Sequence, residues 1–193
     1  MPSGDKGGHL VTITLQTPLA DEVLQLKAGA HVELSGIVYT ARDEAHLRMK
    51  KEGIPFDPKG AVIYHCGPVI QNDRVIAAGP TTSARMNNLT GFLLDKGVRA
   101  LIGKGGMGRE VREQLRNRAV YFAITGGCAA LAATHMTLRG VYFEDLGMAE
   151  AVWVIELDRL PLIVGIDAHG NDLFETVRSQ AKKRFERYQK PLN

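Results

Sequence analysis

Residues 98–127 read VRALIGKGGMGREVREQLRNRAVYFAITGG, and this stretch decides the fold prediction. An apolar run at 98–102 leads into a glycine-rich turn at 103–108, and a polar segment suited to a helix follows at 109–118. A second apolar run at 119–124 then ends in Thr-Gly-Gly. Strands separated by a helical segment of this length are joined by crossovers, so the stretch predicts parallel strands.

The same order of elements extends outward on both sides. Upstream, an apolar run at 75–78 leads into Gly-Pro-Thr-Thr-Ser at 79–83 and then into a helical segment at 84–96. Downstream, the Thr-Gly-Gly turn at 125–127 leads into an alanine-rich segment that is also suited to a helix. We therefore predict an α/β fold with three units of strand, glycine turn and helix.

Further elements are expected outside these units. Strands are expected at 11–15, 31–39, 61–64, 141–143, 152–157 and 162–166, and helices at 20–26, 42–52 and 172–188. The last helix has an apolar stripe at helical spacing, which predicts packing against the core; its members are Leu173, Val177, Ala181, Phe185 and Tyr188. Because no linker divides the chain, 1–193 is expected to be one domain with a flexible tail at 1–8.

Composition and charge exclude several classes of protein. The chain is 45% hydrophobic, enough for a core, and a net charge of +3 with dispersed basic residues argues against a nucleic-acid partner. Cys66 and Cys128 form no CxxC pair, which argues against a zinc ribbon or a thioredoxin-like site. No apolar run reaches the ~18 residues of a membrane span, and the first residues lack the apolar core of a signal peptide. We expect a cytoplasmic protein with neither a membrane nor a nucleic-acid partner.

Three hydroxyl groups stand together before the helix expected at 84–96. Capping a helix needs one hydroxyl, but Thr81, Thr82 and Ser83 supply three, and Arg85 follows closely. In an open α/β sheet, ligands bind beyond the carboxyl ends of strands, where helix N-termini attract anions. An arginine there can hold a carboxylate through two parallel hydrogen bonds. We interpret this turn as an anion site, with plain helix capping as the alternative.

The turn GKGGMG at 103–108 has the glycine spacing G-x-G-x-x-G between a strand and a helix. A dinucleotide site also needs an acidic residue about 20 positions further on, and no Asp or Glu occurs between Glu113 and Glu144. Neither Ser nor Thr follows Lys104, so the turn is not a P-loop. A small-anion site and a tight turn with Lys104 in solvent both stay open.

Cysteine and histidine carry weaker signals. Cys66 follows His65, and Cys128 opens the alanine-rich segment. An unpaired cysteine is usually an inert buried thiol, and the roles of both cysteines stay open. Arg42 and His46 stand at the start of a polar helix, which by itself is typical of a surface helix.

Seven stretches of the chain match the motifs of one family. They are LSGIVYTARDEAH (34–46), GIPFDPKGAVIYHCGPV (53–69), AAGPTTSARM (77–86), LIGKGGMG (101–108), ITGGCAALAATH (124–135), FEDLGMAEAVWVIEL (143–157) and LPLIVGIDAHGNDL (160–173). They cover most of the chain, and GPTTSARM followed by GKGGMG is highly specific. The chain resembles the β subunit, or C-terminal domain, of the class I iron–sulfur hydro-lyases, which are class I fumarate hydratase and L(+)-tartrate dehydratase.

The resemblance implies a swivelling β/β/α domain that works with an α subunit. That partner holds a [4Fe–4S] cluster through three cysteines; this chain has only two, in agreement with a cluster that lies elsewhere, and no metal is expected here. In the family, the TARD arginine, the GPTT threonines, the arginine after them and the GKGG lysine line the substrate site. Carried over, the catalytic residue is Thr81, as the base itself or as part of a proton relay, and the substrate-binding residues are Arg42, Thr82, Arg85 and Lys104.

The implied reaction is the reversible hydration of fumarate to (S)-malate. GPTTSARMN favours fumarate hydratase, whereas the cysteine in GGCAALAATH and the histidine in IDAHGN favour L(+)-tartrate dehydratase, which is the alternative. The chain is expected to dimerise within a heterotetramer and to be inactive without its α subunit. Two interpretations from other classes are a stand-alone module that binds an anion or nucleotide through GKGGMG, and a subunit that only stabilises a partner.

Overall fold

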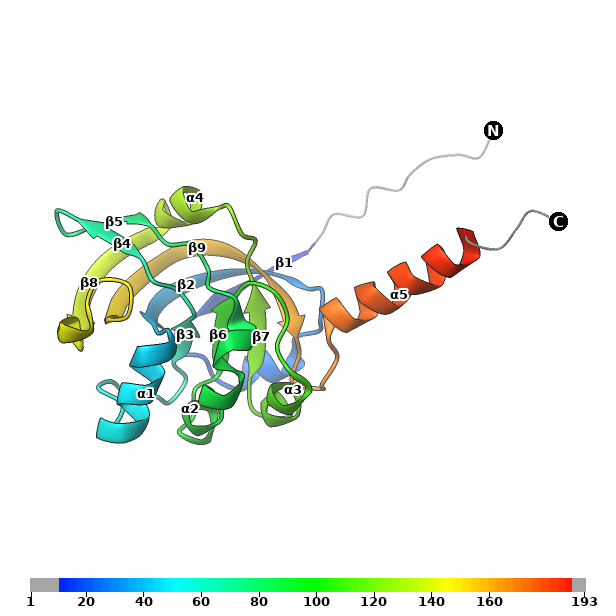
Figure 1. Ribbon diagram of the computed structural model, residues 1–193, viewed down its shortest axis with the longest axis horizontal. Coiled ribbons are helices and arrows are strands. Elements are labelled where there is room, and N and C mark those ends of the chain that lie inside the picture. Colours follow the sequence, from blue (N-terminus) through cyan, green and yellow to red (C-terminus); the bar gives the residue numbers. More distant parts are fainter. Residues whose placement is uncertain (1–10, 189–193) are drawn as a thin grey trace.

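A computed structural model describes residues 11–188, which form a mixed α/β fold (Figure 1). The strands are β1 (Thr12–Gln16), β2 (His31–Thr40), β3 (Val62–Tyr64), β4 (Val69–Gln71), β5 (Arg74–Ala77), β6 (Ala100–Gly103), β7 (Val120–Ala123), β8 (Met136–Tyr142) and β9 (Val152–Ile166). The α-helices are α1 (Asp43–Glu52), α2 (Gly91–Asp95), α3 (Arg109–Leu115), α4 (Ala129–Ala133) and α5 (Leu173–Tyr188). Short 3-10 helices are η1 (Asp21–Gln25), η2 (Ser83–Leu89) and η3 (Glu144–Leu146).

Five of these strands close into a ring. β2, β3, β6 and β7 pair in that order and run parallel, as the crossover pattern predicts. β9 runs antiparallel to β7 on one side and to β2 on the other, which closes the ring. β1 adds to the amino-terminal half of β2, and β8 adds to the first half of β9.

β9 is one strand where the sequence predicts two. The exposed pair Asp158 and Arg159 interrupts the apolar pattern, but the strand continues through it as a β-bulge. Ser35 of β2 faces the bulge, and its hydroxyl accepts a hydrogen bond of 2.9 Å from the amide of Arg159. Arg159 has φ of +49°, which accommodates the extra residue.

The prediction assigned the wrong strand to the first unit of strand, glycine turn and helix. β5 is not part of the parallel sheet, because it pairs antiparallel with β4 in a separate hairpin. Asn72 and Asp73 form the turn, with φ of +50° and +56°, as a tight two-residue hairpin requires. The parallel strand of this unit is β3, and α1 supplies an additional crossover between β2 and β3.

Two other segments that were predicted as helices also differ from the prediction. The segment expected as one helix at 84–96 divides into η2 and α2, and the hydroxyl of Thr90 between them donates to the carbonyl of Met86 at 2.7 Å. α4 is not a crossover helix, because it leads into the antiparallel strand β8 and contacts the β4–β5 hairpin through the amide of Ala78, which donates to the carbonyl of Ala129.

Two apolar clusters lie on opposite sides of the parallel strands. On β3, β6 and β7, successive side chains alternate between them, as the pleat of a strand requires. Val62, Ile102 and Phe122 belong to the cluster beneath β9 and β2. Ile63, Leu101 and Tyr121 belong to the cluster that α1, α2 and α3 cover. This double burial explains why these strands are apolar throughout.

The prediction of core packing for the last helix is wrong beyond its first turn. Phe174 lies against Tyr121, with ring centroids 6.3 Å apart, but α5 then projects away from the sheet (Figure 1). Val177, Phe185 and Tyr188 are 55%, 62% and 88% exposed. Helical periodicity shows that one face is apolar, but it does not show whether this chain covers that face.

Two further predictions concern a flexible tail and membrane-spanning helices. The tail predicted at 1–8 lies outside them. Within residues 11–188, no helix is both long enough and apolar enough to cross a membrane.

Substituting two phenylalanines tests this division between core and projecting helix. Phe122→Ala removes a fully buried ring and is expected to lower the free energy of unfolding by about 3–5 kcal/mol. Phe185→Ala removes a ring that is 62% exposed, and a change below about 0.5 kcal/mol is expected. Denaturant unfolding of the full chain measures both; comparable losses would mean that α5 packs on the domain in solution.

Candidate active site

The carboxyl ends of the parallel strands gather the predicted site residues at one edge of the sheet. Arg42 follows β2, His65 follows β3, Lys104 follows β6 and Thr125 follows β7. Because parallel strands all end at the same edge, their following turns lie together there, where closed as well as open α/β sheets bind ligands.

The threonine turn joins this edge by backbone pairing. Thr82 forms a parallel β-bridge with Lys104. The amide of Ser83 donates to the carbonyl of Lys104 at 3.1 Å, and the amide of Lys104 donates to the carbonyl of Thr81 at 3.3 Å. The amide of Thr81 donates to the carbonyl of His65 at 2.6 Å. The two glycine-rich turns are therefore one structure, anchored to the end of β3.

The three hydroxyl groups of this turn have different surroundings. Ser83 is fully buried, Thr81 is half-buried and Thr82 is exposed. Thr82 occupies the N-cap position of η2, but its side chain makes no capping hydrogen bond. The capping alternative is therefore wrong for Thr82, and within residues 11–188 neither the hydroxyl of Thr81 nor that of Thr82 makes a hydrogen bond.

Two arginines reach the edge from the start of α1 and from η2. Arg42 forms an ion pair with Glu150, with its Nε 3.3 Å from Oε1. Arg85 forms an ion pair with Asp43, the first residue of α1, with its Nη2 2.6 Å from Oδ2. The Arg42 side chain also lies across Gly67, where a Cβ would stand 3.0 Å from both Cδ and Nη1. Gly67 therefore leaves the space that Arg42 occupies.

Lys104 lines a hollow of about 430 Å³ at the ends of β6 and β7. It is the one charged residue among those that line it: Lys104, Gly105, Ala123, Ile124, Thr125, Gly126, Ile163, Leu173 and Phe174. Within residues 11–188, no carboxylate forms an ion pair with Lys104. Its ammonium is therefore available to an anion, which favours the anion-site interpretation over a tight turn alone.

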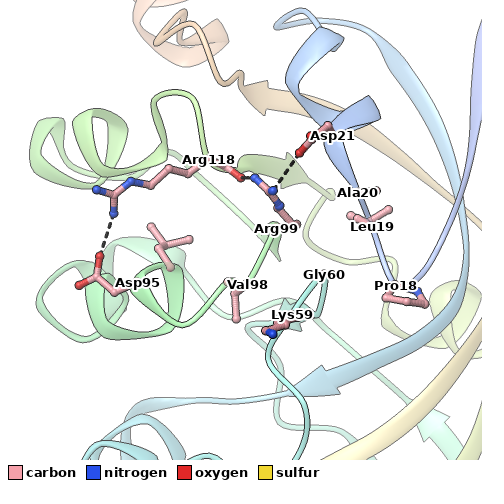
Figure 2. A pocket seen from close by; sticks show the side chains of 12 residues that line it. Pro18, Leu19, Ala20, Asp21, Lys59, Gly60, Asp95, Val98, Arg99 and Arg118 are labelled. Atoms are coloured by element: carbon pink, nitrogen blue, oxygen red, sulfur yellow. Dashed lines mark hydrogen bonds and ion pairs between the residues drawn. The ribbon is translucent and has the colours of Figure 1, made fainter.

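A larger hollow, of about 560 Å³, lies at the opposite edge, where the parallel strands begin (Figure 2). Figure 2 shows Arg99 directed toward Asp21 and Arg118 toward Asp95; the N–O distances are 2.9 and 2.8 Å. These arginines are already neutralised, and none of the predicted site residues is near. Of the predicted site residues, only Lys104 lines the smaller hollow at the carboxyl ends, and none lines the larger one.

Two buried histidines lie beneath the edge, and the sequence showed neither as buried. His46 is fully buried in α1, so the interpretation of α1 as a plain surface helix is wrong on this face. The Nδ1 of His46 lies 2.7 Å from the carbonyl of Arg42, and the Nδ1 of His65 lies 2.8 Å from the hydroxyl of Ser83. The two rings lie 5.5 Å apart. Burial lowers the pKa of His46 to about 4 and lowers the pKa of His65 well below its ordinary value.

Cys66 and Cys128 are both free thiols in different surroundings. Cys66 is buried, and burial raises the pKa of its thiol to about 12, which suppresses the thiolate. The thiol of Cys128 donates to the carbonyl of Thr125 at 2.7 Å. Within residues 11–188, no three His, Cys, Asp or Glu side chains converge as metal ligands would.

Comparison with known proteins identifies the family. The family model described as Fumarase C-terminus matches residues 2–177. The chain belongs to this family. Its Thr81 turn, its Lys104 loop and its Arg42 segment all lie inside the matched region.

Relatives within the fumarase C-terminus family are named after two substrates. A Methanocaldococcus jannaschii protein, provisionally named L(+)-tartrate dehydratase subunit beta, is 43% identical over 85% of this chain and 91% of its own length. The L(+)-tartrate dehydratase subunit beta of Escherichia coli is 36% identical over 92% of each. A Geobacillus stearothermophilus protein, provisionally named fumarate hydratase class I, is 36% identical over 93% of this chain but only 37% of its own length. These names are those of hydro-lyases, and they leave the substrate of this chain unresolved.

The buried histidines predict how stability depends on pH. A folded-state pKa below the ordinary value of 6.5 means that the unfolded chain binds more protons as the pH falls. Stability is therefore complete above about pH 6.5 and decreases toward about pH 4, by up to about 1.4 kcal/mol per pH unit for each histidine.

Urea unfolding of the full chain between pH 4.5 and 7.5 measures this slope. His46→Gln should lower this slope by the contribution of about one bound proton. His31→Gln is the control for replacing a histidine by glutamine. A slope that is the same in wild type and His46→Gln would contradict the burial of His46.

Proposed function

We propose that this chain is the β subunit of an iron–sulfur hydro-lyase that catalyses the reversible hydration of fumarate to (S)-malate. The observation that carries the proposal is the backbone pairing of the Thr81 turn with Lys104 at the carboxyl edge of the parallel strands, the edge to which Arg42 and Arg85 also belong. The family and the names of its members support a hydro-lyase. The swivelling arrangement of the domain remains part of this proposal.

The charges at the edge fit a small dicarboxylate. A four-carbon dicarboxylate carries two negative charges, and Arg42, Arg85 and Lys104 offer three positive ones. Two of these cations are already paired with Glu150 and Asp43, so substrate carboxylates would compete with those partners or share the cations with them. Lys104 lacks such a partner within the described residues and is assigned the first contact. Thr82, exposed beside Lys104, is assigned a hydrogen bond to the substrate.

Thr81 is assigned the proton transfer at C3 of malate. Dehydration takes a proton from C3 and hydroxide from C2, so a proton acceptor must face C3. A threonine hydroxyl is a poor base, and nearby cations stabilise its anion. Its half-buried position beside Lys104 suits that role, in which Thr81 takes the proton itself or is the first group of a relay.

The [4Fe–4S] cluster is assigned to a partner subunit, because the residues described here do not fit it. Cys66 is buried with a raised pKa, Cys128 is engaged with Thr125, and three converging ligands do not occur within residues 11–188. No step of this proposal runs through the cluster on this chain.

An α subunit is the proposed partner. Relatives that match over most of their length are named β subunits, which implies a companion. The Geobacillus relative is much longer than this chain, so its remaining 63% corresponds to a further polypeptide region. The exposed stripe of Val177, Phe185 and Tyr188 also fits a chain that works within a complex. Dimerisation within a heterotetramer stays a prediction.

L(+)-Tartrate dehydration is the second candidate function. The names of the Methanocaldococcus jannaschii and Escherichia coli relatives favour it. Tartrate carries two hydroxyl groups where malate carries one, so its site needs one more polar contact. The same cations would neutralise its carboxylates.

Reconstitution decides between these functions. The purified chain alone is expected to turn over neither malate nor tartrate. Addition of a cluster-bearing α subunit under anaerobic conditions should give hydro-lyase activity, with malate preferred. Preference for tartrate would establish the second candidate, whereas activity of the chain alone would overturn the subunit assignment. Tight NAD or ATP binding in calorimetry would favour the stand-alone module instead.

Two matched arginine substitutions test the site within that complex. Arg85 and Arg118 are both about half exposed, and each pairs with one carboxylate, but they lie at opposite edges. Arg85→Ala is expected to lower kcat/KM about 100-fold or more, because a substrate carboxylate loses its partner. Arg118→Ala should change it less than about twofold. Thr81→Ala should lower kcat by a similar large factor, and equal activity in all three variants would support a purely structural subunit.

A further inference from the structure

A buried chain of hydrogen bonds lies directly under the two glycine-rich turns. The Nδ1 of His65 lies 2.8 Å from the Oγ of Ser83, which lies 3.1 Å from the hydroxyl of Tyr121. The hydroxyl of Tyr121 in turn lies 2.8 Å from the carbonyl oxygen of Gly105. His65, Ser83 and Tyr121 are all fully buried.

The direction of these hydrogen bonds follows from the last acceptor. A carbonyl oxygen can only accept, so Tyr121 donates its one proton to Gly105. Tyr121 therefore accepts from Ser83, and Ser83, having given its proton, accepts from His65. His65 must then carry its proton on Nδ1 as a neutral ring. All three hydrogen bonds are satisfied by this single arrangement, whereas the reverse direction would leave the contact with Gly105 unmade.

The chain connects four separate segments of the site. His65 follows β3, Ser83 belongs to the threonine turn, Gly105 belongs to the Lys104 loop, and Tyr121 lies on β7. Gly103 leaves the necessary space, because a Cβ there would collide with the Oγ of Ser83. The third hydroxyl of the threonine turn is thus directed into the protein, while Thr81 and Thr82 are directed elsewhere.

We propose that His65, Ser83 and Tyr121 are positioning residues that fix the distance between the Thr81 turn and the Lys104 loop. The inference rests on the proposed function of Thr81 and Lys104 and adds residues that need not touch the substrate. Backbone pairing alone holds the turns together through the two hydrogen bonds between Lys104 and its neighbours Thr81 and Ser83. The amide of Thr81 also ties the turn to the carbonyl of His65, and the buried chain adds side-chain links from Ser83 to His65 and to Tyr121 of β7.

Tyr121→Phe is the sharpest variant, because it removes one hydroxyl and keeps the ring that packs against Phe174. Tyr142→Phe is the matched control, since Tyr142 is partly exposed and lies on β8, away from the turns. Both variants are expected to fold, which circular dichroism and the thermal midpoint will show.

Amide hydrogen exchange of the full chain tests positioning without any activity. In Tyr121→Phe, the amides of Thr81, Ser83 and Lys104 are expected to exchange about 10-fold faster, because the turn and loop open locally more often. Amides of β2 should be unchanged, and Tyr142→Phe should match wild type throughout. Unchanged exchange at all three amides in Tyr121→Phe would overturn the proposal.

Kinetics of the complex with the α subunit provide the second measurement. Tyr121→Phe is expected to lower kcat about 10- to 100-fold, because small displacements of reacting groups are costly. KM should change less than about threefold, since Arg42 and Arg85 keep their own contacts. The double variant Tyr121→Phe, Ser83→Ala should have a kcat no lower than that of the less active single variant, because both substitutions break the same chain of hydrogen bonds.

The two measurements separate two kinds of failure. If the wild-type complex hydrates no dicarboxylate, the proposed function fails, and amide exchange still decides whether the chain positions the turns. If the wild-type complex is active and Tyr121→Phe keeps its kcat, the positioning role is overturned while the proposed function stands.

Discussion

Parallel backbone pairing of β2, β3, β6 and β7 is the constraint on which the candidate site depends. It brings four chain segments, separated by up to about 80 residues, to one edge of the sheet. The threonine turn is not the end of any of these strands, and it reaches the edge by pairing with Lys104 after β6 and with His65 after β3. A loop from outside the sheet is thus held in place by strands that are buried on both faces.

Local signals explain what the sequence could predict. Glycine turns, apolar runs and the parallel strand order around Lys104 follow from short stretches, so β6, α3 and β7 are confirmed. The misplaced β5 has the same apolar pattern as a sheet strand, and only Asn72 and Asp73 mark it as half of a hairpin. The bulge at Asp158 and Arg159 resembled a strand end, because two exposed charged residues interrupt an apolar pattern in either case.

Burial depends on partners far away in the chain, and here the sequence was a poorer guide. His46 stands in a polar helix, yet it is covered because β3 brings His65 beneath it. Ser83 looked equivalent to Thr81 and Thr82, but Gly103 opens a space for its side chain alone. In α5 the sequence predicted burial where there is exposure: beyond Phe174, the regular apolar stripe is not covered by any of the described residues. The family resemblance assigned Arg42, Arg85 and Lys104 to one site with Thr81; the structure pairs the Thr81 turn with Lys104, and the shared role of these residues stays a prediction.

The closure of the ring by β9 has a consequence for biosynthesis. β9 pairs with β2, β7 and β8, so the last strand of the sheet completes hydrogen bonding for strands made long before it. Until β9 has been synthesised, β2 and β7 each have a backbone edge without its native partner, which could pair with other chains. The nascent protein is thus most prone to aggregate before β9 is made, when chaperone protection of these edges would matter most.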